Sequence, residues 1–287
     1  MKVKIVTDSH ACLPMEFMKK ENIGYLESLM IIDEKDYKEL SEIDRNDFIK
    51  QIPLFNPYPK TSIGSPQHAL DIFEQAIKEG YKEIFYIGVS PTISNQYNSA
   101  KVAAKKINDK INVTLYECGL STASQGALVL NAVKLLKKGR NVSEVIEELN
   151  KLKQHTHTLG MSQSFEALFK TGKIQKKMSL NVISKLMKLK PMFEVILDEG
   201  VQSRGAGKGN KSALQKVYER LEELAQEGTE YDLFLSDVNN THHFKTIEEE
   251  LGKVMSIKDV HYWKIPPVVI HSLGTESVQV TISPHVN

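Results

Sequence analysis

Short β-type runs alternate with amphipathic helical stretches through the first 155 residues, and this alternation constrains the fold more than any other feature. The strands are expected at Lys2–Thr7, Gly24–Ile32, Ile84–Val89 and Asn112–Glu117, where β-branched and aromatic residues lie between turn residues. One of the helices is expected to begin at Pro66, behind the capping residue Ser65, and to end at Gly80. Strands that alternate with helices of this length are typical of a parallel sheet covered on both faces. We therefore predict a Rossmann-like α/β domain over residues 1–155.

The pattern changes in the second half of the chain, where strands follow one another more closely. Asp198-Glu199-Gly200 separates Phe193–Leu197 from Val201–Arg204, which is a hairpin signal. Further strands are expected at Tyr231–Ser236, Val260–Ile265, Val268–Ser272 and Ser277–Ile282, and helices at Lys211–Glu227 and Phe244–Leu251. The second half therefore predicts another α/β domain, with a mixed sheet, over residues 156–287.

Composition narrows the class of function. The formal net charge of +1 provides no overall field that would attract nucleic acid or an anionic membrane. No apolar run approaches the roughly 18 residues that a membrane span needs, and the two cysteines lack the spacing of a disulfide framework. We expect a soluble, cytoplasmic protein with no nucleic-acid partner and no integral membrane segment.

Hydroxyl and amide side chains gather where predicted strands lead into helices. These junctions are Thr7-Asp8-Ser9, Thr61-Ser62 with Ser65, and Ser90 to Asn95. In a parallel sheet the carboxyl ends of the strands meet at one edge, where ligands bind, and helix N-termini add unpaired N–H groups. Any one of these residues could simply cap its helix, but three such junctions at one edge favour a small-anion site. The sequence does not say whether the anion is a carboxylate or a phosphate.

Other chemical signals are weak. The segment Gly205 to Ser212 nearly matches a P-loop, but Asn210 takes the place of the second glycine and the segment follows a hairpin, so we expect a basic loop instead. His155/His157 and His242/His243 have no carboxylate or cysteine at metal-ligand spacing. We expect no metal, no cofactor and no catalytic residues.

Five segments, taken in order, resemble the DegV family of bacterial fatty-acid-binding proteins, and together they cover nearly the whole chain. They are IVTDSHACLP (Ile5–Pro14), KTSIGSP (Lys60–Pro66), SPTISNQYNSA (Ser90–Ala100), FEALFKTGKI (Phe165–Ile174) and LKPMFEVILDEG (Leu189–Gly200). The sequence departs from the usual family pattern at Asn95-Gln96, Ile63-Gly64 and Thr275-Glu276.

The resemblance implies a parallel α/β domain of the DegV type, a C-terminal α/β domain, and an apolar tunnel for a long-chain fatty acid such as palmitate. By motif position it implies that Thr61, Ser62, Ser94 and Asn95 hold the carboxylate, and we add Ser90, His271 and Ser272 as further candidates near the head group. It also implies a non-catalytic role, in which the protein presents the fatty acid to a separate fatty acid kinase. Acyl chain length, saturation and the identity of that kinase are not encoded.

Two alternatives remain open on the sequence. The same junctions could cradle phosphate in an α/β enzyme that acts on a small phosphorylated metabolite, which predicts a short polar cavity. A pure interaction module would have no enclosed cavity.

Overall fold

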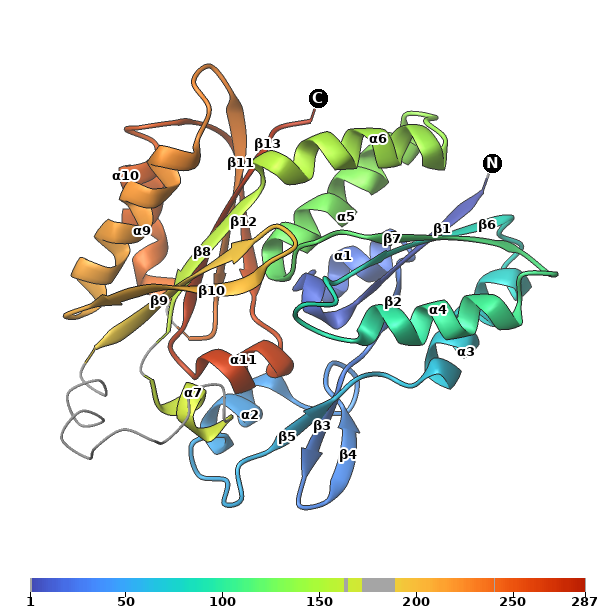
Figure 1. Cartoon of the computed structure of the whole chain (residues 1–287), viewed down its shortest axis with the longest axis horizontal. Coiled ribbons are helices and arrows are strands. Elements are labelled where there is room, and N and C mark those ends of the chain that lie inside the picture. The colour runs from blue at the N-terminus through green and yellow to red at the C-terminus, as the bar shows by residue number, and fades with distance from the viewer. Residues whose placement is uncertain (1, 163–164, 172–188, 240, 287) are drawn as a thin grey trace.

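The computed structural model describes residues 2–162, 165–171, 189–239 and 241–286, and residues 172–174 of the Phe165–Ile174 motif lie outside this part of the chain. A four-stranded parallel sheet, in the order β2-β1-β6-β7, forms the N-terminal half (Figure 1). Its strands are β1 (Val3–Asp8), β2 (Gly24–Leu26), β6 (Glu83–Gly88) and β7 (Asn112–Glu117). The helices that cover this sheet are α1 (Met15–Lys20), α3 (Pro66–Lys78), α4 (Gln96–Lys106), α5 (Thr122–Lys137) and α6 (Val142–Leu152).

Alternation along the strands separates two cores, one on each face of this sheet. Val6, Ile84 and Tyr86 pack with α3 and α4, whereas Ile5 and Phe85 pack with α1, α5 and α6. Because successive strand residues point to opposite faces, a fully apolar strand needs helices on both sides. The predicted parallel α/β arrangement is confirmed.

The second sheet has six strands in the order β10-β9-β8-β13-β11-β12, and only β11 and β12 are parallel. The strands are β8 (His157–Met161), β9 (Lys190–Ile196), β10 (Gly200–Gly207), β11 (Glu230–Asp237), β12 (Ser256–Lys264) and β13 (Val278–Pro284). Helices α9 (Asn210–Leu224) and α10 (Phe244–Leu251) cover one face. The predicted mixed sheet and the predicted hairpin between β9 and β10 are confirmed.

Helix α5 lies between the two large sheets. Its apolar residues share one core with Phe234 and Trp263 of the second sheet, and α5 contacts both β8 and β13. The two halves therefore bury a common interface, and the division at residue 155 remains a proposal.

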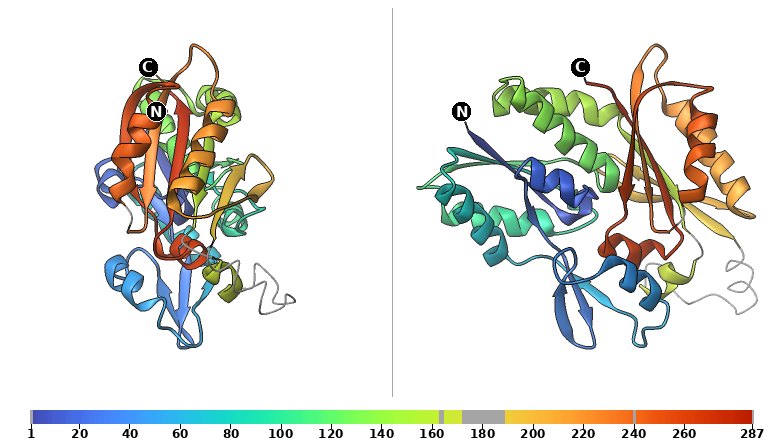
Figure 2. Two further views of the ribbon diagram at one scale, coloured as in Figure 1. Left: turned by 90° about the vertical axis from the view of Figure 1, so that its left-hand side faces the viewer. Right: turned by 180° about the vertical axis from the view of Figure 1, so that it is seen from behind.

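A small antiparallel sheet was not expected. Gly24–Ile32 was predicted as one strand, but the chain breaks at Glu27-Ser28, and β3 (Leu29–Ile32) pairs instead with β4 (Lys35–Lys38) and β5 (Lys60–Ser62). Buried Ser28 causes the break, because its N–H donates to Ser9 Oγ (3.0 Å) rather than to a strand partner. Figure 2 shows the small sheet at one end of the molecule beside α2 (Arg45–Gln51).

The predicted strand Val268–Ser272 is wrong, because this segment forms helix α11 (Pro267–Leu273). Pro267 occupies the first helical position, where its missing N–H costs nothing, and burial of the whole turn explains why no polar face was visible. A short apolar run cannot be distinguished from a strand by periodicity alone.

The remaining elements are short. They are α7 (Glu166–Lys170) and the 3-10 turns η1 (Ser9–Ala11), η2 (Lys153–His155) and η3 (Thr241–His243). Two of them, α7 and η1, reach the cavity described below. Within the described ranges, no helix is both long enough and apolar enough to cross a bilayer.

Candidate functional site

A cavity of about 760 Å³ lies between the carboxyl ends of the parallel strands and the second sheet. Residues that follow β6 and β7 form part of its wall, and residues of β5, β9, β10, α7 and α11 form most of the rest. The wall also includes His10, Ser28, Ser162 and Gln279. The carboxyl edge of a parallel sheet is where a ligand site is expected. The apolar residues of the wall are Ile63, Ile93, Phe165, Leu168, Pro191, Met192, Phe193, Val195, Val201, Val268, Val269 and Leu273.

The predicted head-group residues come together at this cavity. Thr61 and Ser62 from β5, and Ser94 and Asn95 from the loop before α4, all line it. Ser94 is half-buried, whereas the other three are exposed. This group of four, which we call the head-group cluster, therefore lies where the cavity meets solvent.

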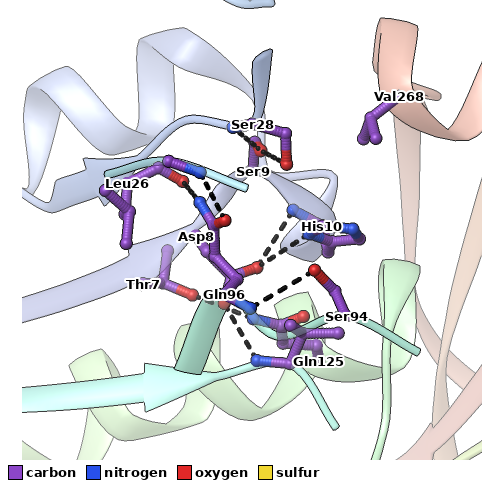
Figure 3. A network of polar contacts seen from close by, with 12 residues as sticks. Thr7, Asp8, Ser9, His10, Leu26, Ser28, Ser94, Gln96, Gln125 and Val268 are labelled. Atoms are coloured by element: carbon purple, nitrogen blue, oxygen red, sulfur yellow. Dashed lines mark hydrogen bonds and ion pairs between the residues drawn. The ribbon is translucent and has the colours of Figure 1, made fainter. Parts of the chain in front are cut away.

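Gln96 holds the two parts of the head-group cluster in register. Its side-chain amide accepts a hydrogen bond from the N–H of Gly64 (2.8 Å) and donates to the carbonyl of Leu26 (3.0 Å) (Figure 3). Gln96 is fully buried, so each of these bonds replaces solvation that the groups have lost. Only glycine fits at position 64, because a Cβ there would lie 2.4 Å from the carbonyl oxygen of Glu27.

Ser65 caps a helix, as the sequence allowed, and Ser94 does so only weakly. Ser65 accepts a hydrogen bond from His68 N–H at 3.1 Å and caps α3, outside the cavity. Ser94 Oγ accepts a long hydrogen bond of 3.4 Å from Gln96 N–H, and Asn95 makes no side-chain cap. A hydroxyl also carries a proton that it can donate, so Ser94 can bind an anion while it supports the helix start.

The side chains of Thr7 and Asp8, in the first polar junction, form hydrogen bonds within the protein. The carboxylate of buried Asp8 accepts hydrogen bonds from His10 N–H (3.1 Å), Tyr86 OH (3.1 Å) and Val89 N–H (2.9 Å). Thr7 Oγ1 donates to the carbonyl of Ile87 (2.8 Å). This junction joins neighbouring strands (Figure 3). Thr7, Asp8 and Ser9 do not line the cavity, whereas the adjacent His10 and Ser28 do.

Ser90 also turns away from the cavity. It is fully buried, it shares a hydrogen bond of 2.8 Å with Thr92 Oγ1, and it is absent from the cavity wall. Ser90 thus supports the loop that carries Ser94, and its predicted place near the head group stays a prediction.

His271 and Ser272 of α11 both line the cavity. His271 Nε2 lies 2.7 Å from the carbonyl oxygen of Pro59, and its ring stacks on Tyr58 with centroids 5.0 Å apart. Tyr58 OH in turn donates to the carbonyl of His271 (2.9 Å). The His271 ring thus fastens α11 to the segment that leads into β5, while Ser272 faces the cavity at the same end of the helix.

The wall of the cavity is nearly free of charge. Among the described residues that line it, none is Lys, Arg, Asp or Glu, and the ionisable side chains are His10 and His271. Phosphate sites typically recruit Arg or Lys, so this wall suits a singly charged or neutral head group better than a phosphate dianion. Hydroxyl and amide donors can solvate a carboxylate without an ion pair if each oxygen is hydrogen-bonded.

Both thiols are buried. Burial raises the pKa values of Cys12 and Cys118 well above their usual value, so both stay protonated near neutral pH. Because the thiolate is the reactive form, neither cysteine is suited to covalent catalysis.

The P-loop-like segment is not a phosphate loop. Gly205 to Gly207 belongs to β10, an antiparallel strand, and α9 begins at Asn210. A phosphate-binding loop follows a buried parallel strand instead.

A protein-family model described as "Uncharacterised protein, DegV family" matches residues 2–285. Protein DegV of Bacillus subtilis (strain 168) is 26% identical to this chain over 258 residues, which is 88% of each protein.

Solved structures share the fold over almost the whole chain. A Thermotoga maritima protein, reported to reveal a fatty acid binding function, has 21% sequence identity and a TM-score of 0.87, with coverage of 99% of this chain and 100% of that one. A stearic acid-binding protein from Eubacterium ventriosum has 20% identity and a TM-score of 0.84, with coverage of 98% of each chain.

Proposed function

Because the chain belongs to the DegV family, we propose that it binds one long-chain fatty acid, with the carboxylate at the head-group cluster and the acyl chain along the apolar wall. The single observation that carries the proposal is the cavity itself, which combines uncharged hydroxyl donors at its opening with an apolar lining. Its volume of about 760 Å³ lies within the range of about 300–1,000 Å³ typical of small-molecule sites. The related structures from Thermotoga maritima and Eubacterium ventriosum are of fatty-acid-binding proteins, which supports the same ligand class here.

The acyl chain and the carboxylate contribute differently to the binding free energy of such a ligand. Burial of about 16 carbons contributes on the order of 10 kcal/mol at ~0.8 kcal/mol per CH₂, before the costs of association. The head group then needs only enough hydrogen bonds to offset the desolvation of its carboxylate. Neutral donors such as Thr61 Oγ1, Ser62 Oγ and Ser94 Oγ meet that need without an arginine or lysine.

We further propose that the protein is a non-catalytic carrier in the cytoplasm and presents the carboxylate to a separate fatty acid kinase. Thr61, Ser62 and Asn95 are exposed, so a carboxylate bound beside them stays within reach of a second protein. The protonated thiols and the nearly uncharged wall agree with chemistry that takes place on the partner.

We expect the purified protein to carry fatty acid. Organic extraction followed by mass spectrometry should give a long-chain fatty acid in near-stoichiometric amount, and delipidated protein should bind added palmitate or oleate. A protein that neither contains a fatty acid nor takes up either added one would contradict the proposal. Co-purification of a phosphorylated metabolite instead would favour the enzyme alternative.

We expect Ser94→Ala to weaken fatty acid binding. Loss of one hydrogen bond to a charged carboxylate costs about 1.5–3 kcal/mol, or roughly a 10- to 150-fold rise in Kd. Titration of delipidated protein with a fluorescent fatty acid would measure this change.

Ser65→Ala is the matched control for that experiment. It also removes a hydroxyl at a helix start, but Ser65 lies outside the cavity wall, so we expect lower stability by about 1 kcal/mol and unchanged affinity. If the Ser94→Ala variant and the unmodified protein bind fatty acid with equal affinity, the carboxylate does not bind at Ser94.

A further inference from the structure

Three potential metal ligands from two neighbouring strands meet on the second sheet. They are Asp232 of β11 and Asp259 and His261 of β12, and their ligand atoms all lie within 4.8 Å of one another. Asp259 and His261 are two residues apart and so share one face of their strand. The register between β11 and β12 shifts between Tyr231 and Leu233, and an irregularity of this kind re-aims side chains. None of the three residues lines the cavity.

Asp232 lies at the bottom of this cluster with one carboxylate oxygen incompletely satisfied. It is fully buried, and its Oδ1 lies 2.7 Å from His285 Nδ1. Its Oδ2 has no hydrogen-bond partner, and the nearest cation is Lys134 Nζ at 3.6 Å, on a side chain that is 32% exposed. A buried anionic oxygen without a hydrogen bond carries a large desolvation cost.

His261 presents a second buried atom with no partner. Its Nε2 is shielded from solvent and makes no hydrogen bond. The ring is fixed by stacking on Phe234, with centroids 4.6 Å apart and planes inclined by 14°. The lone pair or proton on Nε2 is therefore held in position without a protein partner.

The geometry points to a site for a divalent transition-metal ion of the zinc type, with Asp232, Asp259 and His261 as its ligands. One imidazole and two carboxylates suit Zn²⁺ and neighbouring metals, whereas Ca²⁺ and Mg²⁺ prefer oxygen ligands alone. Three protein ligands leave a coordination position for water. Asp259, 56% exposed on its side chain, opens the site to solvent, as an entry path requires.

His285 and Lys134 complete the surroundings of the site. His285 Nδ1 lies within hydrogen-bond distance of Asp232 Oδ1 and 3.9 Å from Asp259 Oδ2, so it orients the ligating carboxylate, as outer-sphere partners of metal ligands do. The metal would replace Lys134 as the counter-charge of Asp232.

Zinc titration of untagged, chelator-treated protein tests this site. Calorimetry should show one equivalent of Zn²⁺ bound, and Co²⁺ should give visible d–d absorption from an ordered ligand set. Asp259→Asn and His261→Gln should each weaken Zn²⁺ binding by at least tenfold, since loss of even an outer-sphere partner costs about 10- to 100-fold. Asp259 is exposed, so its replacement leaves the fold intact, and circular dichroism would verify this.

The double variant His242→Ala/His243→Ala is the control, because these adjacent rings, with centroids 3.9 Å apart, are another histidine pair outside the cluster. It should bind Zn²⁺ like the unmodified protein. Absence of stoichiometric binding, a loss below tenfold in both cluster variants, or loss of binding in the control would each overturn the assignment. Fatty acid binding is measured separately, so failure of one proposal is distinguishable from failure of the other.

Discussion

Replacing Arg45 with alanine should lower the free energy of unfolding by about 3–5 kcal/mol. The guanidinium of Arg45, at the start of α2, donates to three carbonyls: Ile265 (Nε, 2.7 Å), Asp237 (Nη2, 2.8 Å) and Val238 (Nη2, 2.8 Å). These acceptors lie just beyond β12 or at the end of β11. One side chain thus joins α2 to the C-terminal half where the chain enters α11.

The size of this effect follows from the type of bond. Hydrogen bonds from a charged donor are worth about 1.5–3 kcal/mol each. The expected total is below the sum of three such bonds, because Arg45 is only partly buried and water can replace part of what the carbonyls lose. Burial lowers the pKa of Arg45, while the nearby carboxylate of Asp237 acts in the opposite direction. The charge is therefore partly desolvated in the folded protein, where it is compensated by the carboxylate of Asp237 and by the three carbonyls that accept its hydrogen bonds.

Urea denaturation of Arg45→Ala, Arg45→Lys and Arg140→Ala would measure this contribution. Arg140 is the control, because its guanidinium is exposed and its ion pair with Glu144 is 3.6 Å long; we expect a change below about 0.5 kcal/mol there. Arg45→Lys should fall between the other two, since a lysine keeps the charge but loses the planar fork. A loss of less than 1 kcal/mol in Arg45→Ala would show that water replaces the guanidinium.

The fold was predictable from the sequence where an element had a clear periodic pattern and a turn residue beyond its end. The strand Asn112–Glu117 and the helix Phe244–Leu251 have the predicted bounds, and a glycine follows the end of each closely, at Gly119 and Gly252. Short apolar runs were less informative. Val268–Ser272 is helical because Pro267 starts a helix and Glu39 accepts a hydrogen bond from Val268 N–H, across 229 positions of sequence.

The candidate site was predictable by residue type but not by orientation. The sequence indicates hydroxyls at a sheet edge, yet it cannot distinguish Ser94, which faces the cavity, from Ser90, which bonds to Thr92. Gln96 also gave no signal, although it positions the head-group cluster, because its partners are Leu26 and Gly64. Contacts over 30 to 70 positions decide such roles, and no local pattern encodes them.

The buried carboxylate of Glu39 makes stability depend on pH. Glu39 is 0% exposed, and its Oε2 accepts a hydrogen bond of 2.6 Å from Val268 N–H in the first turn of α11. Burial raises its pKa from 4.5 to about 7, against the opposing effects of the Ser9 hydroxyl, His10 and the Val268 N–H. Glu27, a second carboxylate nearby, raises this pKa further.

The sign of the pH effect follows from linkage. A carboxyl whose pKa is higher in the folded state binds its proton more tightly there, so its favourable contribution is complete below pH 4.5 and is lost as the pH rises through about 7. A difference of about 2.5 pH units corresponds to about 3 kcal/mol. We therefore expect Glu39 to lower the free energy of unfolding by about this amount between pH 4.5 and neutral pH.

Glu39→Gln should remove this pH-dependent contribution. A neutral amide oxygen can still accept the hydrogen bond from Val268 N–H, but it no longer ionises, so the variant should gain stability relative to the unmodified protein as the pH rises. Urea denaturation at several pH values between 4.5 and 8 would measure the difference, in which groups common to both proteins cancel. Glu147→Gln, which removes an exposed carboxylate on α6, should differ from the unmodified protein by less than about 0.5 kcal/mol throughout.

A flat difference between Glu39→Gln and the unmodified protein would mean that Glu39 stays charged and paired in the fold. If Glu39→Gln becomes more stable than the unmodified protein as the pH rises, the ionised carboxylate of Glu39 destabilises the fold. The destabilisation would act on α11, because the carboxylate contacts the first turn of that helix. The same helix carries His271 and Ser272 in the cavity wall. Fatty acid affinity, measured in the same pH series, should then fall more steeply above pH 7 in the unmodified protein than in Glu39→Gln, because only the former places a desolvated charge behind that wall.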